Sequence, residues 1–130
     1  MRRLLALGLS LAAMGAGWAQ SGGCNCFPPE VQAQTAREAL QKARVALYGR
    51  VVAVESGGRA RLLVLESFKG AAKDTVVPLL PATPACLTTS LAVGDERLLL
   101  TFDDAAGACD THPPEHYLLA AFRALNASAR

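Results

Sequence analysis

Four cysteines are the residues of this chain with the clearest chemical potential: Cys24, Cys26, Cys86 and Cys109. As thiolates they could hold zinc or copper, with two histidines near the C-terminal end as further ligands. Structural zinc sites usually contain two close-spaced cysteine pairs, however, and here only Cys24 and Cys26 are close. As oxidised residues the four could instead form disulfides. The compartment in which the chain resides therefore decides between the two chemistries.

The first 19 residues have the pattern of an export signal. Arg2 and Arg3 form a basic start, an apolar run follows, and the small residues Gly17 and Ala19 fit a cleavage site. The apolar run is too short to span a bilayer, which needs about 20 residues. We therefore predict a signal peptide over residues 1–19, cleavage after Ala19, and a secreted or periplasmic protein.

Export changes the interpretation of the cysteines. An oxidising compartment and an even count favour a disulfide framework over reactive thiols. A bond between Cys24 and Cys26 would be strained, so each of them is expected to pair with a distant cysteine. A lipid anchor on Cys24 is an alternative, but Ser21-Gly22-Gly23 lacks the aliphatic residue expected three positions before such a cysteine.

Length and charge predict one domain, over residues 20–130, without a nucleic-acid partner. The 13 Lys and Arg residues include Arg2 and Arg3, and they face 11 Asp and Glu residues, so the exported part is formally neutral. A neutral chain offers neither a nucleic-acid surface nor a polybasic membrane patch. No later segment has the apolar length of a membrane span, so none is expected in the domain.

Apolar periodicity predicts strands between two helices. One helix is expected from residue 30 to residue 44, and a second from residue 117 to residue 125. Four strands are expected at residues 45–54, 61–68, 75–80 and 96–102. Pro78 places the third strand at a sheet edge, and Gly49 predicts a bulge in the first. The fold class is therefore an all-β core with a helix at each end.

The remaining polar residues do not form a catalytic pattern. His112 and His116 have the spacing of a zinc-protease helix, but Pro113 and Pro114 lie between them and would interrupt that helix. The sequence contains no glycine-flanked nucleophile and no phosphate-binding glycine loop. We expect the two histidines to be surface residues that cap the final helix. We expect no enzyme activity, no cofactor and no bound metal.

The motifs taken together resemble the tissue inhibitor of metalloproteinases, or netrin-like, domain in its short bacterial form. They are Cys24-Asn25-Cys26, Tyr48-Gly49-Arg50-Val51-Val52, Phe68-Lys69-Gly70, Cys86, the segment from Val93 to Leu100, and Cys109. The resemblance covers most of the chain after the leader. It implies a five-stranded barrel of the oligonucleotide/oligosaccharide-binding type, with flanking helices and stapled by disulfides.

The resemblance also implies a pairing and a binding ridge. The pairing would be Cys24–Cys86 and Cys26–Cys109. The ridge would consist of Cys24 and Asn25 beside Pro84 and Ala85, and the free amine and carbonyl of the first cysteine would chelate the zinc of a target protease.

A chain that begins at Gln20 has an amide instead of an amine at Cys24, and an amide nitrogen is a poor zinc ligand. We therefore expect a binding module whose partner is a protein, such as a secreted zinc metalloprotease, or another envelope component. Cleavage after Gly23 would restore the amine, so a working metalloprotease inhibitor is one alternative. A periplasmic metal-binding protein that uses its cysteines and histidines is the other.

Overall fold

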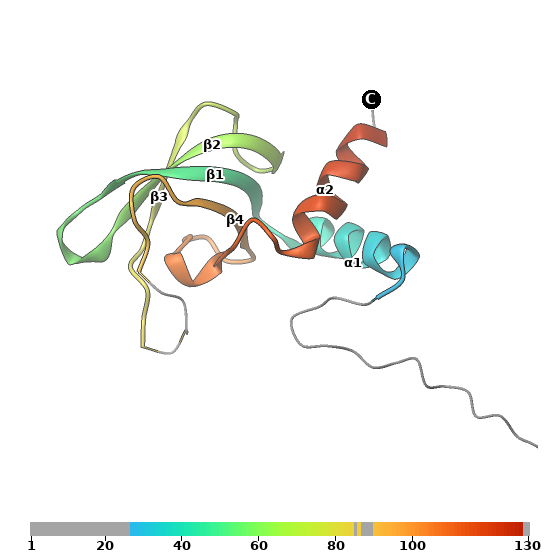
Figure 1. Cartoon of the computed structure of the whole chain (residues 1–130), viewed down its shortest axis with the longest axis horizontal. Helices are drawn as coiled ribbons and strands as arrows, with labels where there is room; N and C mark the ends of the chain where they lie inside the picture. The colour runs from blue at the N-terminus through green and yellow to red at the C-terminus, as the bar shows by residue number, and fades with distance from the viewer. Residues whose placement is uncertain (1–26, 85, 87–89, 129–130) are drawn as a thin grey trace, which may run out of the picture.

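The computed structural model describes residues 27–84, 86 and 90–128, in which an antiparallel sheet lies beside a pair of helices (Figure 1). The helices are α1 (Pro29–Lys42) and α2 (Tyr117–Ser128). The strands are β1 (Val45–Val54), β2 (Ala60–Lys69), β3 (Val76–Leu79), β4 (Glu96–Thr101) and β5 (Thr111–His112). Two short 3-10 turns, η2 (Ser56–Gly58) and η3 (Ala108–Asp110), connect strands. The strand order across the sheet is β3-β2-β1-β4-β5, and every neighbouring pair is antiparallel.

The mostly-β architecture predicted from the sequence is confirmed, but a closed barrel is not. The edge strands β3 and β5 do not pair with each other in the sheet. In the described part of the chain, the two edges approach at a parallel bridge between Leu80 and Gly107. There the Leu80 amide donates to Ala106 O at 2.9 Å, and the Ala108 amide donates to Leu80 O at 2.8 Å. The sheet is therefore open, with its edges linked just beyond the end of β3.

The two faces of the sheet are covered differently because side chains alternate along a strand. One face packs against the helices, and its buried cluster consists of Ala36, Ala43, Ala46, Tyr48, Leu98, Leu100, Leu118, Leu119 and Phe122. The other face holds a second cluster, made of Leu47, Val51, Ala60, Leu62, Val64, Leu79 and Leu99. β1 and β4 supply residues to both clusters, so these two strands join the helix layer to the rest of the sheet.

Gly49 allows the neighbouring strand β2 to approach β1 closely. A Cβ atom at this position would lie 2.6 Å from Leu63 O and 2.8 Å from Leu62 Cγ, both closer than a side chain tolerates. The register between β1 and β2 shifts between Tyr48 and Gly49, which confirms the bulge expected there.

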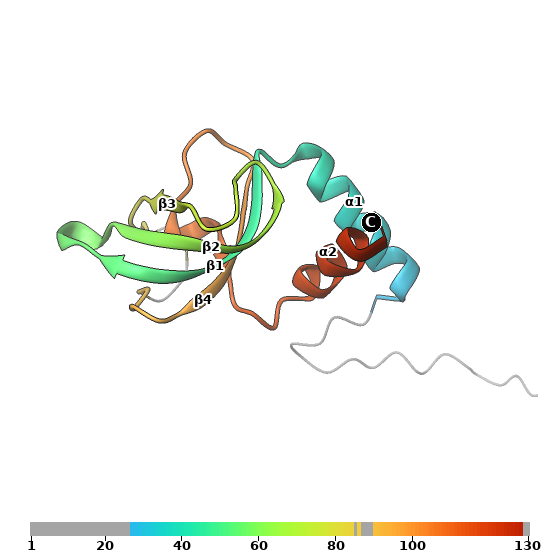
Figure 2. The same ribbon diagram turned by 90° about the horizontal axis from the view of Figure 1, so that it is seen from above.

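The helix pair lies at one end of the sheet, and both views show α2 lying obliquely across α1 (Figures 1 and 2). α2 also reaches the sheet, where the ring centroids of Phe122 and Phe68 are 5.4 Å apart. The C-terminal helix therefore packs on α1 and on β2 together. None of the helices in the described ranges is long and apolar enough to cross a bilayer.

Candidate functional site

A disulfide joins Cys86 to Cys109, with their Cα atoms 5.7 Å apart. The pairing implied by the family resemblance, Cys24–Cys86 and Cys26–Cys109, is therefore wrong, because Cys86 and Cys109 are bonded to each other. Cys24 and Cys26 lie outside the described residues. The long loop between β3 and β4 carries Cys86, and η3 carries Cys109, so the bond fastens that loop to the segment that leads into β5.

Hydrogen bonds support this disulfide-anchored loop from within. The Cys86 amide donates to Thr83 O at 3.1 Å. The Thr83 amide in turn lies 3.4 Å from Cys109 Sγ and donates to it. Of the ridge expected from the resemblance, only Pro84 lies in the described part of the chain, and it is exposed. Asn25 and Ala85 lie outside that part, together with the first two cysteines.

The disulfide also bears on the expected alternative of a metal-binding protein. A sulfur atom in a disulfide is not a thiolate, so Cys86 and Cys109 cannot act as thiolate ligands while they are bonded. Within residues 27–84, 86 and 90–128, no three histidines, cysteines or acids are grouped so that they could hold a metal ion.

The rings of the two histidines lie together just before α2. Their ring centroids are 4.5 Å apart, and the His116 ring stacks on Tyr117 at 5.0 Å. His116 Nδ1 accepts a hydrogen bond of 3.2 Å from the Leu118 amide, so the helix cap expected from the sequence is confirmed for His116. The same expectation is wrong for His112, which is half-buried in β5 and pairs with Leu98 of β4.

Burial lowers the pKa of both histidines below the ordinary value of 6.5. For His112, the nearby His116 and Arg97 lower the pKa further, while Asp110 opposes them. Both rings are therefore mainly neutral at pH 7. A neutral His116 is also what the cap requires, because a protonated Nδ1 could not accept the Leu118 amide hydrogen.

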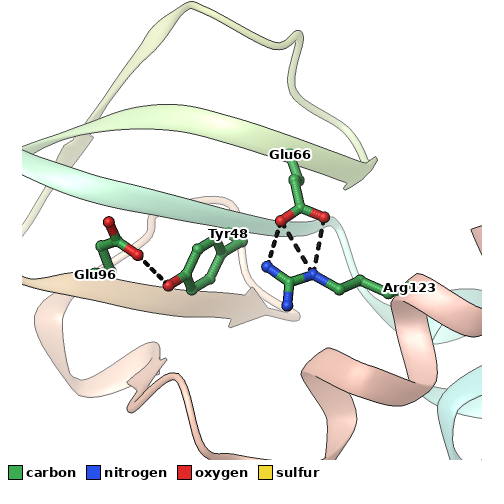
Figure 3. A network of polar contacts seen from close by, with 4 residues as sticks. All are labelled: Tyr48, Glu66, Glu96 and Arg123. Carbon is green, nitrogen blue, oxygen red and sulfur yellow. Dashed lines mark hydrogen bonds and ion pairs between the residues drawn. The ribbon is translucent and has the colours of Figure 1, made fainter.

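A polar network connects the sheet to α2 (Figure 3). The Tyr48 hydroxyl of β1 donates to Glu96 of β4. Arg123 of α2 donates from Nε to both carboxylate oxygens of Glu66, at 3.0 and 3.1 Å, and its guanidinium lies 5.1 Å from the Tyr48 ring centroid. Burial, followed by the bond to Glu96, raises the pKa of Tyr48 to about 12. The phenol is therefore too weak an acid for proton transfer near neutrality, and the network fixes the position of α2.

A pocket of about 380 Å³ opens where β3 runs beside the turn that follows β4. We call it the β3 pocket. Its lining residues are Val45, Glu55, Arg59, Ala60, Arg61, Val77, Pro78, Leu79, Leu80, Thr101, Asp104, Ala105 and Ala106. Its volume is within the range of about 300–1,000 Å³ that is usual for small-molecule sites. The sequence alone could not reveal this pocket, because its walls come from four separate segments: Val45, residues 55–61, residues 77–80 and residues 101–106.

The described polar contacts mostly close turns or fix helices. The Thr111 hydroxyl, for example, donates to Ala108 O at 2.7 Å, and the Thr75 hydroxyl donates to Ala72 O at 2.6 Å. Two features of the described residues that could receive a partner or ligand are the disulfide-anchored loop with Pro84 and the β3 pocket. No protein-family model, no curated protein and no solved structure matches this chain.

Proposed function

We propose that this chain is an exported, disulfide-stabilised binding module of netrin-like type that captures a protein partner through the disulfide-anchored loop at Pro84. The proposal depends mainly on one observation, the bond between Cys86 and Cys109. Disulfides form and persist in oxidising compartments, which agrees with the export signal expected at residues 1–19. The same bond fastens the loop that presents an exposed Pro84, so a partner meets a surface that is already tethered to the fold and less entropy is lost on binding.

The disulfide also favours the binding module over the inhibitor. An inhibitor of the family type needs Cys24 tethered to Cys86, so that its amine is held beside the Pro84 loop. Because Cys86 is bonded to Cys109, that tether is not formed. A free amine at Cys24 would then have no covalent link to Pro84, and it would lose the preorganisation that tight chelation needs.

The partner surface is tested by photo-crosslinking in cells that export the full chain. A p-benzoylphenylalanine residue is placed at position 84 in one variant and at position 37, on exposed α1, in a matched control. We expect position 84 to give one discrete adduct with an exported protein, and position 37 to give none. Equal labelling from both positions, or no adduct from position 84, would contradict the proposed surface.

The inhibitor alternative is tested with two purified forms, one starting at Gln20 and one starting at Cys24. Both are titrated against a panel of secreted zinc proteases, and N-terminal sequencing of the exported protein establishes which form is natural. We expect neither form to inhibit tightly, because Cys86 is already bonded. Tight inhibition by the Cys24 form would favour the inhibitor, and tight inhibition by the Gln20 form would refute the chelation argument itself.

A further inference from the structure

The β3 pocket has an apolar floor made of buried core residues. Ala60 and Leu79 are 2 % and 1 % exposed, and they belong to the cluster on the face of the sheet opposite the helices. Val77 packs partly against the same cluster. Leu80, at the mouth, is 47 % exposed although its backbone is tied to Ala106 and Ala108 on both sides. The pocket thus presents an apolar surface whose backbone is held in place by hydrogen bonds.

Among the described residues, the two acids at the mouth of the pocket form ion pairs with arginines, and one further arginine does not. Glu55 binds Arg61 at 3.1 Å, and Asp104 binds Arg44 at 3.0 Å. Arg59 also lines the pocket, and no described carboxylate forms an ion pair with it. Both acids of the mouth are therefore matched by arginines, and Arg59 leaves one positive charge for a ligand to neutralise.

We propose that the β3 pocket binds a small amphipathic anion, with an apolar tail against Val77, Leu79 and Leu80 and a carboxylate paired with Arg59. An arginine guanidinium can bind a carboxylate through two parallel hydrogen bonds, which gives the head group a defined orientation. The tail removes apolar pocket surface from water, and this burial adds to the affinity. This ligand site is independent of the protein surface at Pro84.

The test uses the exported chain and three eight-carbon probes that share one tail: octanoate, octan-1-ol and octylammonium. Amide chemical shifts are followed during titration with each probe. We expect shifts centred on Ala60, Val77 and Ala106. We expect octanoate to bind about fivefold more tightly than octan-1-ol, as an exposed ion pair allows. Octylammonium should bind most weakly, because its charge faces Arg59.

Variants separate the head group from the tail. Arg59→Gln should lower the affinity for octanoate to that for octan-1-ol and leave octan-1-ol unchanged, while Arg37→Gln on α1 should change neither. Leu80→Ser should weaken both probes, and it lies at the exposed mouth, where loss of folding is not expected. Ala106→Phe should block both, with the dispersion of the amide spectrum reporting that the variant is folded.

Three results would overturn the proposal. They are equal affinities for octanoate and octan-1-ol, tighter binding of octylammonium, and shifts that map away from the pocket. None of these results bears on crosslinking at position 84, so failure of the ligand site and failure of the protein-binding surface are distinguishable.

Discussion

Removing the Cys86–Cys109 bond should destabilise the protein by an amount that depends on the length of the loop that the bond closes. The two cysteines are 23 residues apart. In the chain-entropy model, freeing a loop of this length from its cross-link stabilises the unfolded state by about 3 kcal/mol. A domain of about 100 residues loses about 4–8 °C of Tm for each kcal/mol, so Cys86→Ser/Cys109→Ser should lower the Tm by about 12–24 °C.

The measurement is thermal unfolding of the oxidised protein, followed by far-UV circular dichroism, with Cys24→Ser/Cys26→Ser as the matched control. The control removes the same number of cysteines but leaves the Cys86–Cys109 bond intact, so its Tm should stay within about 2 °C of the wild type. The alternative pairing of Cys24 with Cys86 and Cys26 with Cys109 predicts a large loss for both variants. A large loss in the control, or a non-reducing peptide map without the Cys86–Cys109 peptide pair, would refute the assigned pairing.

The other predictions concern a phenol, a histidine cap and a turn glycine. Because the folded-state pKa of Tyr48 is raised to about 12, its phenol should remain protonated at pH 11, as measured by the absorbance at 295 nm of the wild type minus that of Tyr48→Phe. Burial lowers the pKa of His116 in the folded state below its ordinary value of 6.5, so the unfolded state binds more protons. The free energy of unfolding should therefore keep its full value above pH 6.5 and decrease as the pH falls below that value. His116→Asn keeps an N-cap acceptor without a titrating ring, so urea unfolding at pH 7 and pH 5.5 should show a smaller loss than in the wild type. Gly70 has φ +82° and a Cβ atom there would lie 2.2 Å from Arg44 O, so Gly70→Ala should cost about 3 kcal/mol in urea unfolding. Gly94→Ala, with φ +99° and open space around the Cβ position, should cost about 1 kcal/mol, and equal losses would contradict the steric argument.

The longer elements could be predicted from the sequence because each has a local pattern. The first helix was expected to start at residue 30 and forms as Pro29–Lys42, since its apolar positions recur every three to four residues. The first strand was expected at residues 45–54 and forms as Val45–Val54. Pro78 correctly marked β3 as an edge strand, because proline has no amide hydrogen for a central ladder.

Features that depend on contacts between distant segments could not be predicted in this way. β5 consists of two residues, Thr111 and His112, and is defined by its pairing with β4 alone. The partner of Cys86 depends on which cysteine the fold brings within bonding distance, and spacing along the chain does not contain that information. The ion pair between Glu66 and Arg123 joins residues that are 57 positions apart. The β3 pocket likewise forms only when four separate segments meet.

β1 supplies alternate side chains to two apolar clusters, and this limits how the sequence can change during evolution. Deletion of one residue between Ala46 and Val51 would move the side chains along the rest of the strand to the opposite face of the sheet. Leu47 and Tyr48 belong to different clusters, so both clusters would lose residues in a single event. Length changes are therefore expected to accumulate in the turns around residues 56–58, 71–75 and 102–107. The spacing between Ala46 and Val51 should be inherited unchanged even where the residues themselves diverge.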